Sequence, residues 1–265
     1  MKITALAENQ TKTGMRTVHG LALYIETKNH KMMFDLGPDE TMFENAEKLG
    51  IDLKAVDTVI ISHGHKDHGG ALGRFLSENE QAKIYIQKRA FAPHISRPGN
   101  MVKDISLDVS LMDNPRIVLL EGAFRIDEEL ELFTAKSTEK CYSYINKCLY
   151  EGEERDSFKH EQNLLIHGDR LVLILGCGHS GIVNILDCVE DEKTAVCVGG
   201  FHLGNPDTGV SVDDTLLDAI AKELALYKDT RFYTCHCTGL PAYEYLSSKL
   251  DNMNYLACGD SIEIS

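Results

Sequence analysis

Hydrophobic positions recur with two different periods along this chain, and the changes between the periods predict strands and helices. In the first half, strand-like runs cover residues 18–26, 31–34, 56–61 and 83–86. Helix-like spacing covers residues 43–50, where Gly50 is a stop signal, and residues 71–76. Residues 63–68 form a polar loop between the third strand and the second helix.

Regular strand and helix patterns return in the second half of the chain. Strands are predicted at residues 163–166, 171–175, 194–198 and 231–234. Helices are predicted at residues 178–189, 212–227 and 241–250, and the last of these begins with Pro241. Two strand-rich halves, each followed by helices, favour an α/β fold with two sheets between helical layers. Because no linker is evident, we expect a single domain over residues 1–265.

Residues 88–160 interrupt this regularity. Within them, residues 116–120 and 130–133 have strand-like patterns, whereas residues 142–159 form a charged, loop-like tract. We interpret residues 88–160 as a variable part of the domain that covers or flanks a site, and a plain surface insertion explains the pattern equally well. His94 lies there in a polar context with no second ligand nearby in sequence, so we expect no site role for it.

The charge balance excludes some functions. The chain has 27 Lys and Arg against 41 Asp and Glu, a formal net charge of −14, which argues against nucleic-acid binding.

No apolar run approaches the ~18–20 residues of a membrane-spanning helix. The first residues become polar too early for a signal peptide. We therefore expect a cytoplasmic protein with no membrane partner, whose eight cysteines are thiols. Its oligomeric state is left open.

The run HGHKDH at residues 63–68 concentrates metal-binding groups directly after a predicted strand. Neutral imidazole is a preferred ligand of zinc and similar divalent metals. His63 and His65 are two residues apart and can point the same way, while Asp67 and His68 can reach back from the far side of the loop. The loop can therefore begin two adjacent metal sites. A catalytic zinc takes about three protein ligands plus water, so further ligands must come from elsewhere.

Several motifs carry a resemblance to a known family. The run VIISHGHKDHGGAL at residues 59–72 resembles the HxHxDH signature of the metallo-β-lactamase superfamily. FDLG at residues 34–37 is similar to the superfamily's first motif, in which an Asp supports the metal loop. The runs LGCGHSGIVNI at 175–185, GGFHL at 199–203 and TCHCTG at 234–239 resemble its 7,8-dihydropterin synthase-like branch. The resemblance covers nearly the whole chain and implies an αβ/βα four-layer sandwich with a dinuclear site where strand-end loops meet.

The resemblance also implies most of a ligand set. It assigns His63, His65, Asp67 and His68 to the metal-binding loop at residues 63–68, called the metal loop below. It also assigns His236 to the position of the last metal-binding histidine. The middle of the set departs from the superfamily's pattern, which places an Asp after the strand equivalent to residues 171–175.

For this middle part we expect His179 to be the ligand. Cys177 as a thiolate could take the position of the missing Asp, and His160 could take an earlier histidine position. Asp35 is expected to orient a ligand histidine or the loop backbone instead of binding metal itself.

Asp67 and His202 are the candidate catalytic residues. Asp67 can hold a metal and also orient or accept the proton of a water nucleophile. His202, in the GGFHL motif, could protonate a leaving group or stabilise an oxyanion. We expect one or two divalent transition metals per chain, zinc first and iron or manganese as alternatives. The function expected is a metal-dependent hydrolase or transferase that acts on a small phosphate-ester or pterin-type substrate through a metal-bound hydroxide.

Two other functions stay open at this point. A di-iron redox enzyme of the same fold would have Glu where this chain has His65, so the sequence disfavours that alternative. A non-catalytic metal-binding or regulatory protein would also keep the metal loop. The sequence does not identify the small-molecule substrate. Local positive charge that a phosphate would need is supplied by Lys88, Arg89, Arg97 and Lys103.

Overall fold

The computed structural model describes residues 1–136, 139–189, 193–206 and 208–265, which fold into two compact units. The first unit comprises Met1–Gly122, Leu149–Gln162 and Leu256–Ser265, and the second comprises Ala123–Cys148 and Asn163–Tyr255. The chain enters the second unit twice and returns to the first unit for its last residues. The single domain expected from the sequence stays a prediction.

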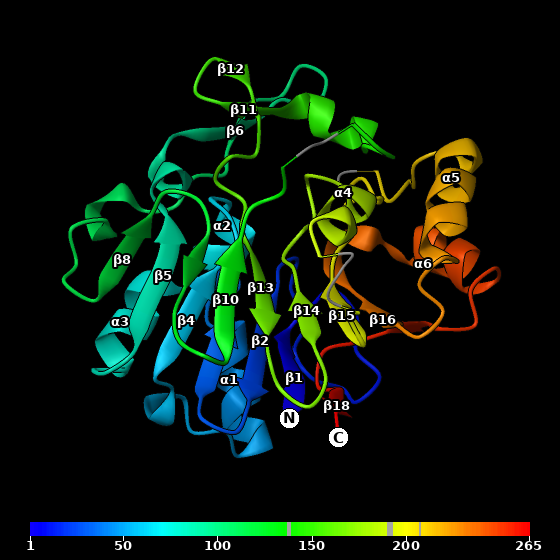
Figure 1. Cartoon of the computed structure of the whole chain (residues 1–265). Coiled ribbons are helices and arrows are strands. Elements are labelled where there is room, and N and C mark those ends of the chain that lie inside the picture. Colours follow the sequence, from blue (N-terminus) through cyan, green and yellow to red (C-terminus); the bar gives the residue numbers. More distant parts are fainter. Residues whose placement is uncertain (137–138, 190–192, 207) are drawn as a thin grey trace. The chain divides into compact units, whose positions relative to one another are not determined.

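The first unit is built on a seven-stranded sheet with the order β18-β1-β2-β3-β4-β5-β8 (Figure 1). Its strands are β1 (Lys2–Ala7), β2 (Ala22–Glu26), β3 (Lys31–Phe34), β4 (Thr58–Ile61), β5 (Lys83–Gln87), β8 (Ile117–Leu120) and β18 (Ser261–Glu263). Strands β18 to β3 are antiparallel neighbours, whereas β3, β4, β5 and β8 are parallel. The parallel strands therefore end at one edge of the sheet, where the loop after β4 lies.

Helices follow β3 and β4 and share an apolar core with this sheet. They are α1 (Thr41–Leu49), α2 (Lys66–Gly69) and α3 (Leu72–Glu78), with the 3-10 helices η1 (Leu53–Ala55), η2 (Lys88–Phe91) and η3 (Val109–Leu111). Met42 of α1 and Phe75 of α3 belong to one buried cluster with Val59, Ile61 and Ile84 of the sheet. Each such side chain contributes about 1.5–3 kcal/mol when fully buried. This core holds the sheet edge that carries the loop.

A four-stranded sheet with the order β12-β11-β6-β7 completes the first unit. Its strands are β6 (His94–Ser96), β7 (Lys103–Asp104), β11 (Leu149–Glu151) and β12 (Glu154–Arg155). The pairing of β6 with β11 places His94 opposite Glu151. Two stretches from opposite ends of the variable region thus lie side by side (Figure 1).

The second unit is also built on a seven-stranded sheet, with the order β17-β16-β15-β14-β13-β10-β9. Its strands are β9 (Phe124–Arg125), β10 (Leu130–Phe133), β13 (Asn163–Ile166), β14 (Val172–Ile174), β15 (Val196–Gly199), β16 (Arg231–Thr234) and β17 (Met253–Tyr255). Its helices are α4 (Ile182–Asp187), α5 (Asp214–Leu224) and α6 (Leu240–Ser247), with the 3-10 helices η4 (Tyr144–Cys148) and η6 (His236–Thr238). Strands β14 to β17 are parallel, and Ile185, Ile220 and Leu246 of the three α-helices share one buried core with Phe232.

Most elements predicted from periodicity are confirmed. Strands β3, β10, β13 and β16 occupy the predicted residues. Helix α1 ends at Gly50, whose φ of 69° is the left-handed conformation that commonly stops a helix. None of the helices in the described part of the chain has the length and apolar character needed to cross a bilayer.

Some predicted bounds are wrong. The strand predicted from residue 18 begins only at Ala22, and the helix predicted from residue 178 begins only at Ile182. Gly178 and Gly181 delay that helix because their φ values of 62° and 91° lie outside the right-handed helical region.

Other elements have no counterpart in the sequence prediction. The one-turn helix α2 begins within the polar loop at residues 63–68, and the charged tract at residues 142–159 contains β11 and β12. Strands β1, β17 and β18 were not predicted either. These strands are short or interrupted by polar residues, so their pairing partners decide their conformation.

Candidate metal centre

Asp35 anchors the metal loop of the first unit through three hydrogen bonds. It follows β3, and Ser62 follows the neighbouring parallel strand β4. The buried Asp35 carboxylate accepts hydrogen bonds from the Ser62 N–H at 2.7 Å, the Ser62 hydroxyl at 2.7 Å and His68 Nδ1 at 2.6 Å. Asp35 has a φ of 61°, which is uncommon for a residue other than glycine. It therefore orients both a loop histidine and the loop backbone.

These hydrogen bonds also select the protonation of two imidazoles. Because Ser62 donates its hydroxyl proton to Asp35, its Oγ accepts a hydrogen bond from His63 Nδ1 at 2.8 Å. His68 likewise donates from Nδ1 to Asp35. Both rings then carry their lone pair on Nε2, the arrangement that a metal-ligating histidine uses.

His65 and Asp67 complete the loop. The ring centroids of His65 and His63 are 4.5 Å apart. Burial, together with nearby His160, lowers the pKa of His65 well below its ordinary value, so this ring is neutral at pH 7, as a ligand must be. Asp67 lies in the first turn of α2, and its carboxylate is 3.7 Å from His68 Nε2. The first unit therefore brings its four predicted ligands together.

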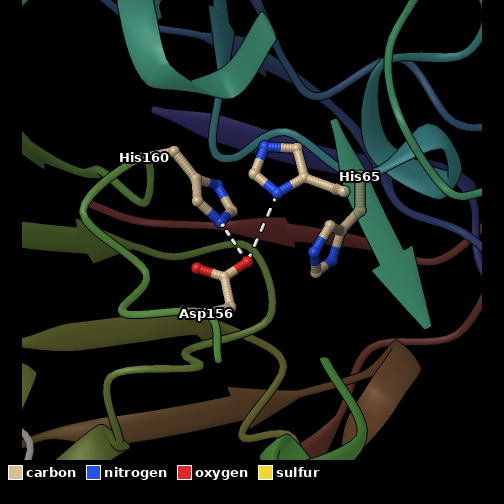
Figure 2. A group of neighbouring side chains, drawn as sticks. His65, Asp156 and His160 are labelled. Atoms are coloured by element: carbon tan, nitrogen blue, oxygen red, sulfur yellow. Dashed lines mark hydrogen bonds and ion pairs between the residues drawn. The ribbon is translucent and has the colours of Figure 1, made fainter. Parts of the chain in front are cut away.

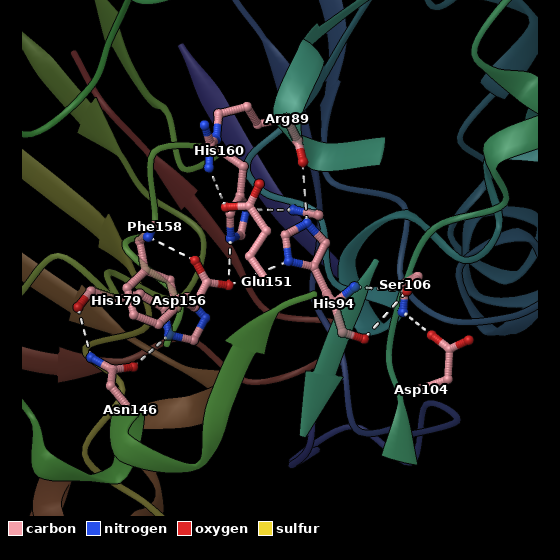
Figure 3. Close-up of polar contacts among 11 residues, drawn as sticks. Arg89, His94, Asp104, Ser106, Asn146, Glu151, Asp156, Phe158, His160 and His179 are labelled. Carbon is pink, nitrogen blue, oxygen red and sulfur yellow. Dashed lines mark hydrogen bonds and ion pairs between the residues drawn. The ribbon is translucent and has the colours of Figure 1, made fainter. Parts of the chain in front are cut away.

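Beside the loop, His94, Asp156 and His160 form a buried network (Figures 2 and 3). Asp156 Oδ2 accepts a hydrogen bond from His160 Nε2 at 3.0 Å and lies 3.3 Å from His94 Nδ1, while Oδ1 accepts the Phe158 N–H at 2.7 Å. His160 Nδ1 accepts the N–H of loop residue Gly64 at 3.0 Å. Burial opposes ionisation of Asp156, but its hydrogen bonds with His160 and His94 hold its pKa below the ordinary value.

The hydrogen bonds of this network define the protonation of His160. In His160 one nitrogen accepts and the other donates, which is the neutral form, and burial lowers the pKa of this ring. His94 Nε2 faces the Arg89 carbonyl at 3.2 Å while Nδ1 faces the Asp156 carboxylate at 3.3 Å. His94 and Asp156 therefore form a buried histidine–carboxylate pair.

The contacts of this network suit it to supporting the metal loop more than to binding a metal itself. His65, His94, Asp156 and His160 do place one possible ligand atom each within 4.8 Å of one another. However, both nitrogens of His160 already serve Gly64 and Asp156, and a metal bond would displace one of these contacts. His160 as a metal ligand stays a prediction, and these hydrogen bonds weigh against it.

Two of the four basic residues considered for phosphate binding, Lys88 and Arg89, have acidic partners. Lys88 Nζ is 3.3 Å from Glu121, and the Arg89 guanidinium is 2.8 Å from Glu151 (Figure 3). Both side chains are half exposed, so these ion pairs are weak and a phosphate could compete for them.

In the second unit, three loops follow neighbouring parallel strands and meet at the same end of the sheet. They are residues 176–180 after β14, residues 200–203 after β15 and residues 235–239 after β16. The Gly200 N–H donates to the Gly176 carbonyl at 2.8 Å, and the Leu203 N–H donates to the Cys237 carbonyl at 3.1 Å. These bonds bring the candidate residues of the three loops together.

His179 is oriented by Asn146 (Figure 3). Asn146 lies in η4, within the region interpreted as variable. Its Nδ2 donates to the His179 carbonyl at 2.9 Å, and its Oδ1 accepts a hydrogen bond from His179 Nδ1 at 2.9 Å. The lone pair of His179 is therefore on Nε2, as in the two anchored histidines of the first unit.

Two cysteines and three histidines gather in this unit. Cys177, His236 and Cys237 place one possible ligand atom each within 4.8 Å of one another, and so do Cys177, His179 and His202. All five side chains are buried, and His202 and His236 have left-handed φ values of 50° and 48°. Burial opposes ionisation of Cys237, but hydrogen bonds with Cys177 and His202 hold the pKa of its thiol well below the ordinary value.

Comparison with known families agrees with this chemistry. The family model described as the metallo-beta-lactamase superfamily matches residues 15–196, more than half of the chain. The chain belongs to the metallo-β-lactamase superfamily. Members of this superfamily generally bind divalent metals, and the buried His, Cys and Asp groups of this chain include sets that could hold one.

Two curated relatives come from Methanocaldococcus jannaschii. An uncharacterised protein is 27% identical over 269 residues, which cover 99% of this chain and 100% of the relative. The other, 7,8-dihydropterin-6-methyl-4-(beta-D-ribofuranosyl)-aminobenzene-5'-phosphate synthase, is 28% identical over 271 residues, covering 91% of this chain and 89% of that protein.

Among solved structures, Tm1679, described as a metal-dependent hydrolase of the beta-lactamase superfamily, matches with a TM-score of 0.81 and 26% identity. The match covers 100% of this chain and 99% of Tm1679. The αβ/βα fold class expected from the sequence, that of the metallo-β-lactamase superfamily, is thereby confirmed.

Several residues near these metallo-β-lactamase motifs were missed by the sequence analysis. His94 was not expected to have a site role, yet its ring contacts the Asp156 carboxylate beside the metal loop. Asp156, Asn146 and Cys237 were not considered at all. The sequence held two weak signals, since Asp156 stands four residues before His160 and Cys237 directly follows a predicted ligand.

Proposed function

We propose that this protein is a metal-dependent hydrolase or transferase that acts on a small phosphate-ester or pterin-type substrate. The observation that carries the proposal is the hydrogen bonding of His63 and His68, which places the lone pair of each ring on Nε2. Membership of the metallo-β-lactamase superfamily supports a metal-dependent hydrolase-type fold. The relative named as a dihydropterin phosphate synthase supports the substrate class.

The donor set of the first unit fits one or two divalent transition metals, and zinc is the metal that imidazole-rich sites commonly take. In the first unit, His63, His65, Asp67 and His68 would bind the metal. In the second unit, the proposed ligands are His179 and His236. A bound divalent ion supplies a nucleophile at neutral pH by lowering the pKa of water, and it polarises a phosphoryl or carbonyl oxygen.

The residues of the chain have separate roles in this proposal. Asp35 holds His68 and the loop backbone in place, so the ligands are pre-organised before substrate arrives. The Asp67 side chain is 24% exposed, so its carboxylate can accept a proton from the attacking water and pass it to solvent. His202 is the proposed donor of a proton to the leaving group.

Metal content and phosphodiester turnover test the proposal. Purified protein should contain zinc by elemental analysis and hydrolyse bis(p-nitrophenyl) phosphate, and a chelator should abolish the turnover. His65→Ala should lose metal and turnover together. His30→Ala is the matched control, because His30 is a histidine of the same unit whose ring bonds to Asp57 at 2.8 Å instead. Turnover that survives complete metal removal would contradict the proposal.

A further inference from the structure

We propose that the second unit carries a sulfur-rich metal half-site, in which Cys177 and Cys237 bind a thiophilic divalent metal as thiolates together with His236. The inference rests on the proposed metal dependence and adds Cys237, a residue that the sequence analysis did not consider. It also restricts the expected metals to those that favour sulfur ligands.

The ligand atoms of these three residues are close enough to share one ion. Cys177, Cys237 and His236 each place one such atom within 4.8 Å of the other two. Around a tetrahedral zinc, with bonds of about 2.3 Å to sulfur and about 2.0–2.1 Å to nitrogen, ligand atoms stand roughly 3.3–3.8 Å apart. The 4.8 Å limit is therefore within about 1.5 Å of the spacing that a bound zinc requires.

The surrounding backbone leaves space for the Cys237 sulfur. A Cβ atom added at Gly200 would lie 2.4 Å from Cys237 Sγ and 3.0 Å from the Gly176 carbonyl oxygen. Gly200 is needed here for its lack of a side chain, because its φ is not in the left-handed region. The loop after β15 is therefore shaped around the sulfur of the loop after β16.

The position of Cys237 is also fixed by its own backbone. Its carbonyl accepts hydrogen bonds from the Leu203 N–H at 3.1 Å and the Gly204 N–H at 2.9 Å. On its N-terminal side, His236 has a φ of 48°, an unusual conformation that the surrounding contacts must maintain. A side chain held in this way is pre-organised, as a metal ligand should be.

Two other cysteines of the second unit lie in surroundings that differ from those of Cys177 and Cys237. Cys197 is fully buried in the apolar core, where burial raises the pKa of its thiol. Cys188 is partly buried, and its sulfur donates to the Asn184 carbonyl at 3.4 Å, as the Cys237 sulfur does to the Cys177 carbonyl. Neither stands among the ligand groups named above, so Cys177 and Cys237 differ from them in having a second sulfur and imidazoles within reach.

The chemistry of two thiolates selects the metal. Two thiolates balance the charge of a divalent ion, which removes much of the cost of burying them. Soft sulfur ligands favour zinc and cobalt(II) over magnesium or manganese, which prefer oxygen. We therefore expect excess manganese to fail to displace zinc from the protein.

Cobalt(II) substitution tests this inference without relying on activity. Cobalt bound by thiolates gives a sulfur-to-metal charge-transfer band in the near ultraviolet, which imidazole and carboxylate ligands do not give. The cobalt-loaded wild type should show this band. Cys177→Ser and Cys237→Ser should each lose part of it, the double variant should lose all of it, and the control Cys188→Ser should keep it.

The outcomes separate this inference from the proposed function. If cobalt binds to the wild type with no charge-transfer band, the thiolate half-site is wrong while the metal dependence stands. If neither cobalt nor zinc binds, both proposals fail. If a serine variant does not fold, the intensity of the wild-type band, which rises with each cobalt–thiolate bond, distinguishes two thiolate ligands from one. A band that Cys188→Ser removes and Cys237→Ser leaves intact would also overturn the assignment.

Discussion

Replacing Asp156 by asparagine probes the buried histidine–carboxylate network beside the metal loop. The Asp156 carboxylate is fully buried and receives hydrogen bonds from His160 and the Phe158 N–H, with His94 at 3.3 Å. Asp156→Asn removes the negative charge and one of the two acceptor oxygens that these groups share. Leaving a buried polar group without its partner costs about 1–3 kcal/mol, and more for a charged group. We therefore expect the free energy of unfolding to fall by an amount in that range.

Urea unfolding followed by far-ultraviolet circular dichroism measures this change, since the chain has no tryptophan to report fluorescence. Asp218→Asn is the matched control. Asp218 bonds to Lys249 Nζ at 2.6 Å, but both side chains are exposed. An exposed pair contributes about 0–1 kcal/mol, so the control should unfold close to the wild type. A loss for Asp156→Asn no larger than that of Asp218→Asn would show that the buried network contributes nothing to stability.

The pH dependence gives the same prediction an independent check. Although burial opposes its ionisation, the hydrogen bonds of Asp156 with His160 and His94 hold its pKa below the ordinary value in the folded protein. A lowered carboxyl pKa stabilises the fold above the unfolded-state pKa of about 3.9, and this stabilisation is lost as the pH falls below it. The stability difference between wild type and Asp156→Asn should therefore be largest near neutral pH and shrink below about pH 4.

Three further predictions follow from single contacts. Asp35→Asn should lower metal affinity by about 10–100-fold in competition with a chelator, because it weakens the orientation of the ligands. Gly64→Ala should destabilise the first unit by about 1–3 kcal/mol or prevent folding, because the added Cβ would lie 2.4 Å from His94 Nε2. In the control Gly73→Ala the atom nearest to the added Cβ is 3.6 Å away, so this variant should be as stable as the wild type or more stable. Asn146→Ala should leave the buried His179 Nδ1 without its acceptor and lower the free energy of unfolding in urea by about 1–3 kcal/mol. An unchanged unfolding midpoint would show that this contact does not stabilise the protein.

The local pattern of the sequence determined most of the regular structure and the location of the metal loop. Strands such as β3 and β16 and helix α1 follow from periodicity and from a stop signal within a few residues, and these are properties of neighbouring positions. The HxHxDH run is local in the same sense. It places His63, His65, Asp67 and His68 on one strand-end loop, so their proximity needs no information about the rest of the fold.

Only the tertiary structure decided which residues support that loop. His94 and Asp156 are 62 positions apart in sequence and meet because β6 pairs with β11 in a particular register. Asn146 reaches His179 across 33 positions. Neither pair has a periodic or compositional signal, since each partner is an ordinary polar residue in an irregular segment.

The second unit shows the same division between local and tertiary information. Its glycine-rich loops and histidines were visible as motifs, but the role of Gly200 was not. That glycine is required because a sulfur from a loop 37 positions later occupies the space where its side chain would be. The sequence determined which donor atoms the chain owns, and the parallel order of β14, β15 and β16 decided which of them lie together, because parallel strands deliver their following loops to one edge of the sheet.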